Sequence, residues 1–560
     1  MRKIGRFFLR LFGWLRVLFG WIRRVAVKTG RFIQKQYRRL NFTLHINILI
    51  IICLGYIYIP VFLFVALWLR PVLAALFCIM MTLAVLMYVL HLLNEIKRTP
   101  ERVYHGNYLF LLLAVAFLFG IGFVSGWSGH GIQTEDWPKH NAILHDLLER
   151  DWPVMYQGES GPSLLTYYIA QYLPPAMIGR LFHLPFQQVL LANWLWSSVG
   201  LTLVYLVFVC AAGARGIKRQ LTCLAMLIFC GGLMSLQQSV GNSLYPEDIL
   251  VGQEGWLDYF LSYGRYMLQY RTNFISIRWV FGQTLVPWMV TCIFYMRRHD
   301  VRNYLPLLLP VLLSGTFSFV PLAVFAVVAY VCAVIRLRKW KAVLAQTFSP
   351  QNLLSATSLG VVLFLYFLGY MIQAKPEEMG VSLVGYGGAD FGIYLIFVLG
   401  SFVLFTLPIL KEHLTNSLFW TAIGLMLALP FIKLGMANDL LMGAGIVTSF
   451  VLYLCMAQFL FGHRKEANKT EKSRQRHHVR RGLLIALMLV SFLKPALELY
   501  HLHAHDYQYA PNDEWQTLED FADPEDETIA MDIRYNYYTY EPDDSPFMKY
   551  IGKKTTEVTP

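Results

Sequence analysis

The sequence predicts an all-α fold, a polytopic transmembrane helical bundle, on three observations. Of the 560 residues, 56% are hydrophobic and only 15% are charged. Apolar runs recur along the chain, and their lengths are close to the roughly 20 residues that a helix needs to cross a bilayer. Before residue 502, no stretch between two such runs is long enough to form a soluble domain. One helical membrane domain, residues 41–501, therefore accounts for most of the chain.

We expect about 13 spans, which alternate with short loops on both sides. They are residues 46–69, 72–93, 108–127, 189–213, 220–236, 276–296, 304–315, 318–335, 353–373, 392–411, 418–435, 437–460 and 483–501. The pair 304–315 and 318–335 could instead be one broken hairpin. The run 164–184 is ambiguous. A full crossing there would place three basic clusters outside, so we expect it to dip into the membrane or lie on its surface.

Charge predicts the orientation, because lysine and arginine near span ends stay in the cytoplasm. Residues 1–40 hold twelve Lys or Arg and no acid, and their apolar positions predict an amphipathic helix on the anionic lipids of the inner leaflet. Residues 502–560 hold fourteen acids and four bases and are expected outside, as a small cap or a partly disordered tail. These features predict a multi-pass plasma-membrane protein with a cytoplasmic N-terminus and an external C-terminus.

On this topology the polar residues collect on the outer side. A first outer loop, residues 128–188, opens with the acid pair Glu135-Asp136 and has helical character up to Arg150. A second outer loop, residues 237–275, carries further acids and arginines. Ionisable groups at membrane depth are costly, so a cluster that faces one aqueous cavity is a functional hypothesis by default.

Several short blocks in the middle two-thirds of the chain carry a resemblance to known proteins. They are Asp136-Trp-Pro-Lys-His140, Trp152-Pro-Val-Met-Tyr156, Tyr167-Tyr168-Ile-Ala-Gln-Tyr-Leu-Pro174, Trp279-Val-Phe-Gly-Gln283 and Asn438-Asp439-Leu-Leu-Met442. The chain resembles the GT-C superfamily of membrane glycosyltransferases, and its blocks are similar to those of uncharacterised bacterial multi-span members. Such proteins commonly place arginine after the last methionine, where Gly443 stands here. The pair of spans at 46–93 would be an added hairpin.

The resemblance implies transfer of a sugar, with inversion, from a polyprenyl-phosphate-linked donor to a glycan, lipid or cell-wall acceptor on the outer face. Inversion requires a carboxylate that removes a proton from the attacking hydroxyl, and we assign this role to Asp136 first and Glu135 second. Cationic side chains would bind the departing phosphate. The candidates for it are Arg265, Arg271, Arg278 and Lys433.

The remaining candidate residues would line the substrate pocket: His140, Asp248, Asn438 and Asp439. A divalent cation, Mg or Mn, could lie between the outer-loop acids, although no spacing in the sequence demands a metal site. We expect no nucleic-acid partner. The cysteines show no metal-binding spacing and are interpreted as apolar packing residues.

Each assignment has a simpler alternative. Asp136 could cap the helix that follows it. The arginines could be interfacial anchors whose charged ends reach the headgroups. Asn438 and Asp439 could cap the span that they precede.

The whole protein could also belong to another class. A transporter or flippase would need as many spans, but it predicts internal pseudo-symmetry and ionisable residues near the bilayer midplane. A polymerase or ligase of lipid-linked glycans would depend more on arginine and histidine than on the Glu135-Asp136 pair.

Overall fold

The structure is a computed structural model. It describes residues 39–130, 133, 137–158, 161–234, 236–237, 249–250, 261–263, 266–337, 340–373, 382–388, 390–434, 438–462, 471–504, 517–522 and 537–554. The predicted amphipathic segment 1–40 lies almost wholly outside these residues, and so does most of the predicted loop 237–275.

The fold is a bundle of helices, and eight of the described helices are long and apolar enough to cross a membrane. They are Ile46–Trp68, Pro71–Ile96, Phe186–Ala212, Thr316–Arg336, Trp340–Ile372, Phe391–Glu412, Asp439–Phe461 and Glu471–Tyr500. Shorter apolar helices cover Tyr108–Val124, Val301–Leu313 and Ser417–Phe431. The prediction of a helical membrane protein is therefore confirmed, whereas the count of 13 spans stays a prediction.

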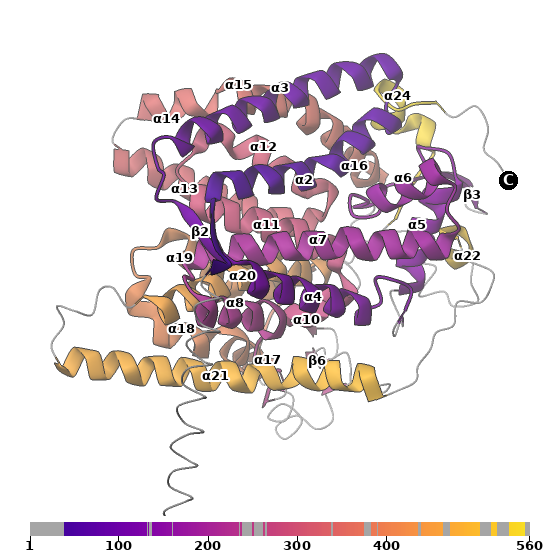
Figure 1. Cartoon of the computed structure of the whole chain (residues 1–560). Coiled ribbons are helices and arrows are strands. Elements are labelled where there is room, and N and C mark those ends of the chain that lie inside the picture. Colours follow the sequence, from indigo (N-terminus) through magenta and orange to yellow (C-terminus); the bar gives the residue numbers. More distant parts are fainter. Residues whose placement is uncertain are drawn as a thin grey trace, which may run out of the picture.

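The first two long helices form an antiparallel hairpin at the edge of the bundle (Figure 1). Helix α2 (Ile46–Trp68) begins where the His45 ring accepts a hydrogen bond from the Asn47 amide, and α3 (Pro71–Ile96) begins at a proline, which is suited to a first helical turn. Strands β1 (Asn41–His45) and β2 (Val103–Asn107) pair antiparallel at the open end of this hairpin.

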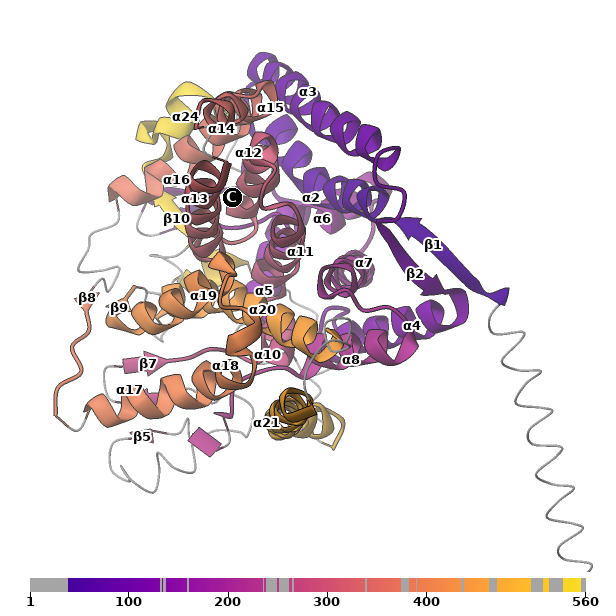
Figure 2. The ribbon, with the colours of Figure 1, turned by 90° about the vertical axis from the view of Figure 1, so that its left-hand side faces the viewer.

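The helices that carry the site residues lie deeper in the bundle. Helix α20 (Asp439–Phe461) is the most enclosed, with 94% of its apolar window buried, against 22% for α3. It packs against α11 (Phe281–Arg297), α13 (Thr316–Leu337) and α19 (Ser417–Ala428), and α11 also packs along α7 (Phe186–Ala212). Figure 2 shows several of these helices end-on.

Three predicted spans are shorter or broken in the structure. Helix α4 (Tyr108–Val124) has 17 residues and α8 (Ile217–Phe229) has 13. The predicted span 276–296 is interrupted at Val280, which separates α10 (Asn273–Trp279) from α11. All seven residues of α10 are buried in the protein interior.

The ambiguous run 164–184 contains only one ten-residue helix, α6 (Leu173–Phe182). At about 1.5 Å of rise per residue, this helix is too short to cross the roughly 30 Å of a hydrocarbon core. Whether the run dips into the membrane or lies on its surface stays a prediction.

The described parts of the C-terminal region form a folded cap on the first loop. Strand β10 (Tyr538–Tyr540) pairs with β4 (Gly161–Leu165), which pairs with β3 (Met155–Gly158). Helices α22 (Leu518–Ala522) and α24 (Pro546–Tyr550) lie at the same end of the bundle as α6 and α5 (Trp137–Glu149) (Figure 1). We call residues 517–522 and 537–554 the C-terminal cap.

Candidate functional site

The acid pair Glu135-Asp136 lies outside the described residues, but the residues on either side of it are firmly placed. Gln133 is buried, and its side chain donates to the Gly126 carbonyl at 2.7 Å and accepts from the Asn141 amide at 2.9 Å. Trp137 is buried and stacks on Phe281, with 5.6 Å between the ring centroids. The described chain is therefore attached to the protein interior on both sides of the pair, and Trp137 attaches it at the start of α11.

His140 links three parts of this end of the bundle. Because the Trp279 carbonyl can only accept, the Nε2–H of His140 donates to it, at 2.8 Å. The Tyr172 hydroxyl then donates to Nδ1 at 2.6 Å. With both ring nitrogens engaged in this way, His140 holds α5, the segment before α6 and the end of α10 together rather than offering a free metal ligand.

A polar cluster forms where three of the sequence blocks meet. Tyr168 is half-buried, and its hydroxyl accepts hydrogen bonds from the Tyr167 hydroxyl and from the side-chain amide of Gln283. Burial raises the pKa of the Tyr168 hydroxyl well above its usual value. The neighbouring Tyr537 hydroxyl and the Asp439 carboxylate raise this pKa further. We call Tyr168, Gln283 and Asp439 the hydroxyl cluster.

In the hydroxyl cluster, one hydrogen-bond donor and one hydrogen-bond acceptor have no partner among the described residues. The Tyr168 oxygen accepts both of its hydrogen bonds, so its own proton has no acceptor among the described residues. The Oε1 atom of Gln283 is buried and has no hydrogen-bond partner in the described part of the chain. A buried acceptor without a partner costs roughly 1–3 kcal/mol, so this one calls for an explanation.

The cap contributes to the same place. The ring of Tyr537 stacks on Tyr167, with centroids 4.2 Å apart and an interplanar angle of 18°. The Ser318 hydroxyl on α13 donates to the carbonyls of Gln283 and Gly443 at 3.2 and 3.0 Å, which fixes the start of α11 beside α20. Segments from five distant parts of the sequence thus surround the hydroxyl cluster.

The predicted cations that the structure describes differ in their burial and in their contacts. Arg278 is 2% exposed, and its guanidinium lies 4.7 Å from the centre of the Trp279 ring. This burial contradicts an interfacial anchor, whose charged end would reach the headgroups. Arg271 is half-buried, and its Nε donates to Gln269 Oε1 at 3.1 Å. Lys433 is half-buried and lies opposite Ser382 in a pair of two-residue antiparallel strands. Arg265 lies outside the described residues.

Of the other predicted pocket residues, the structure describes Asn438 and Asp439. Asn438 is buried at the N-terminus of α20 in a left-handed conformation (φ 55°), and its side chain makes no capping bond there. Capping alone therefore does not account for Asn438. Asp439 is the first residue of α20, where the helix dipole favours a negative charge. Asp248 lies outside the described residues.

Gly443 has a packing role. A Cβ atom at this position would lie 2.6 Å from the Cβ of Phe317, so α13 leaves no room for a side chain. The arginine that the resemblance implies at this place is absent, and this part of α20 supplies no cation.

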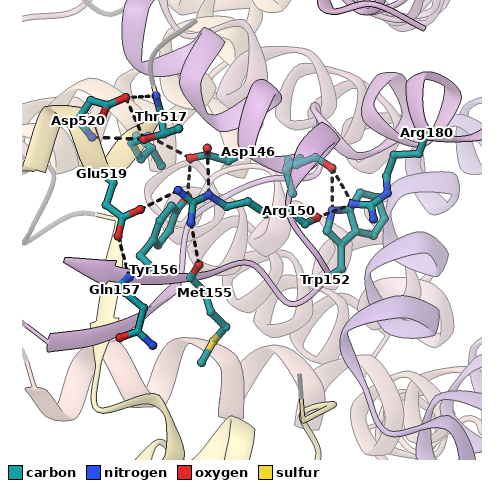
Figure 3. A network of polar contacts seen from close by, with 12 residues as sticks. Asp146, Arg150, Trp152, Met155, Tyr156, Gln157, Arg180, Thr517, Glu519 and Asp520 are labelled. Atoms are coloured by element: carbon teal, nitrogen blue, oxygen red, sulfur yellow. Dashed lines mark hydrogen bonds and ion pairs between the residues drawn. The ribbon is translucent and has the colours of Figure 1, made fainter. Parts of the chain in front are cut away.

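A second polar network, which the sequence did not single out, attaches the cap to α5 (Figure 3). Asp146 is buried, and its Oδ2 accepts from the Tyr156 hydroxyl at 2.8 Å and from the Leu518 amide at 3.0 Å. Arg150 lies 3.5 Å from Asp146 and 2.7 Å from Glu519. Burial raises the pKa of Asp146 to about 6, against the lowering effects of the Leu518 amide, Arg150 and Tyr156.

In the part of the chain that the structure describes, no group of three or more His, Cys, Asp and Glu side chains is arranged to hold a metal ion. No protein-family model, curated protein or solved structure matches this chain. The fold therefore defines its class, a helical membrane protein with a polar cluster and a folded cap at one end.

Proposed function

We propose that this protein is a GT-C-like membrane glycosyltransferase, which moves a sugar from a polyprenyl-phosphate-linked donor to a hydroxyl acceptor on the outer face, with inversion. The observation that supports this most is the hydroxyl cluster. Its spare donor on Tyr168 and its spare acceptor on Gln283 belong to neighbouring side chains joined by a hydrogen bond. A hydroxyl group both donates and accepts, so one sugar hydroxyl satisfies both atoms.

The surroundings of the cluster fit the rest of the reaction. Asp136, with Glu135 second, is our candidate base for the attacking hydroxyl, and it belongs to the chain between the anchored residues Gln133 and Trp137. Arg278 is our first candidate for the departing phosphate, because a buried guanidinium can bind phosphate oxygens bidentately in a site of low dielectric.

The remaining assignments are secondary. Arg265, Arg271 and Lys433 are further candidates for the phosphate, and Asp439 with Asn438 would border the pocket. No step of this proposal passes through a metal ion. Mg or Mn would have to be held by acids of the outer loops that lie outside the described residues.

A transporter remains the competing class, and one observation bears on it. Lys494 and Glu498 form a buried ion pair at 3.4 Å within α21 (Glu471–Ala504), inside a predicted span. The predicted span 483–501 is centred on residue 492, so Lys494 lies about 3 Å from its middle and Glu498 lies further toward its outer end. A transport site is expected near the bilayer midplane. This ion pair is therefore the observation that supports transport as the second candidate function.

The test is transfer of isotopically labelled sugar from a polyprenyl-phosphate donor pool to endogenous acceptor in membranes that contain the full-length protein. Tyr168→Phe and Gln283→Leu should each lower the transfer rate about tenfold, the value of one neutral hydrogen bond of roughly 1.4 kcal/mol. Tyr295→Phe is the control, because Tyr295 lies at the opposite end of α11 and bonds Gln458. Unchanged transfer in both site variants would remove the hydroxyl cluster from the reaction.

A further inference from the structure

The turn between α2 and α3 carries a groove that is separate from the hydroxyl cluster. Its volume is about 340 Å³, and the last turn of α2, the first two turns of α3 and Lys553 line it. Alanines at positions 66, 74 and 75 leave the hollow, because a larger side chain at any of them would fill it. Every lining residue except Lys553 is apolar or a cysteine.

The groove opens on a surface that would face lipid. Helix α3 is the least buried of the long apolar helices, sharing little of its surface with the bundle, and Val72 and Ile79 beside the groove are exposed. Exposed apolar side chains on a membrane helix contact acyl chains. The bilayer is therefore the natural source of an occupant.

The cation at the mouth of the groove is held there by backbone pairing. The Lys553 amide donates to the Trp68 carbonyl at 2.8 Å, and the Arg70 amide donates to the Ile551 carbonyl at 2.9 Å. The Arg70 guanidinium also donates to the carbonyls of Lys549 and Gly552, at 2.9 and 3.1 Å. These bonds fix Lys553 at the end of α2, while no described residue forms an ion pair with its ammonium group.

We propose that this groove binds one acyl chain of an anionic phospholipid, with the phosphate at Lys553. The apolar floor accommodates the chain, and the ammonium supplies the complementary charge at the level where the α2–α3 hairpin turns. Because the bound lipid would touch both the hairpin and the C-terminal cap, it would also stabilise the attachment of the cap. This inference does not depend on the proposed glycosyl transfer.

The test is lipid binding to the purified full-length protein, measured by native mass spectrometry with phosphatidylglycerol and phosphatidylcholine of identical chains. We expect phosphatidylglycerol to bind more strongly. Lys553→Gln should weaken it about fivefold, the usual contribution of one lysine beside an anionic lipid, and leave phosphatidylcholine unchanged. Ala75→Phe should weaken both lipids because it fills the groove.

Two neighbouring variants are the matched controls. Lys554→Gln removes an adjacent exposed charge, and Leu76→Phe adds the same ring outside the groove, so neither should change binding. Equal loss in Lys553→Gln and Lys554→Gln would reduce the effect to general surface charge and overturn the proposal. Full retention of lipid by Ala75→Phe would exclude the groove as the place of the acyl chain.

Discussion

Raising the pH from about 5 to about 8 should weaken the attachment of the C-terminal cap to α5, because Asp146 then ionises in a buried position. Its pKa of about 6 in the folded protein compares with about 3.9 for an unperturbed aspartate. A folded-state pKa above the reference means that the protonated form favours the docked state. This stabilisation is complete below about pH 4 and is lost as the pH rises through about 6.

The size of the effect follows from the difference in pKa. Two units correspond to about 3 kcal/mol over the whole titration if undocking exposes Asp146 fully, and about half of this, roughly 1.4 kcal/mol, falls between pH 5 and pH 8. His145 on the same helix works in the opposite direction, because burial lowers its pKa and its protonation at low pH costs stability. The net change should therefore be smaller than the limit set by Asp146.

Hydrogen exchange of the α22 amides, corrected for the intrinsic effect of pH, measures this attachment directly. Asp146→Asn is the informative variant. Both hydrogen bonds of the carboxylate fall on Oδ2, and an amide oxygen can accept them without a charge. We expect the Asp146→Asn variant to lose the weakening at high pH and to keep only the opposite trend from His145. The same pH dependence in wild type and variant would refute the reasoning.

Further predictions concern the other site residues. Arg278→Ala should weaken binding of a polyprenyl-phosphate analogue more than binding of the acceptor, measured by titration of each; equal weakening would indicate a structural role. Gly443→Ala should lower the thermal stability of the detergent-solubilised protein by about 1–3 kcal/mol, because the new methyl group would overlap Phe317. A stability equal to wild type would show that α13 can move away.

The sequence predicted the positions of the helices because membrane spans are encoded locally. A run such as 437–460 or 46–69 is mostly apolar and needs no distant partner to form a helix. The errors fall where polar residues extend or interrupt a helix. Helix α21 starts at Glu471, twelve residues before the predicted span, and Val280 breaks a span that hydropathy reads as continuous.

The cap could not be predicted, since it depends on contacts between distant segments. Tyr538 pairs with Leu165, and Asp146 binds the Leu518 amide, each across more than 370 residues of sequence. The spacing of Asp146 and Arg150 was a local signal of an ion pair, but it carried no information about Glu519.

The hydroxyl cluster was partly visible in the sequence. Tyr168, Gln283 and Asp439 all belong to the blocks that carry the resemblance, but only Asp439 was chosen as a site residue. Nothing in the pattern showed that Tyr168 and Gln283 bond to each other, because that depends on how α11 packs beside the segment before α6.

The central claim is that Asp136 removes the proton from the acceptor as the sugar is transferred, and one comparison tests it most directly. Sugar transfer by Asp136→Asn should fall by at least about a hundredfold, the usual contribution of a general base, with donor binding retained. Asp151→Asn, which changes an exposed carboxylate of the same loop, should transfer at the wild-type rate. Transfer by Asp136→Asn at the rate of this control would contradict the account.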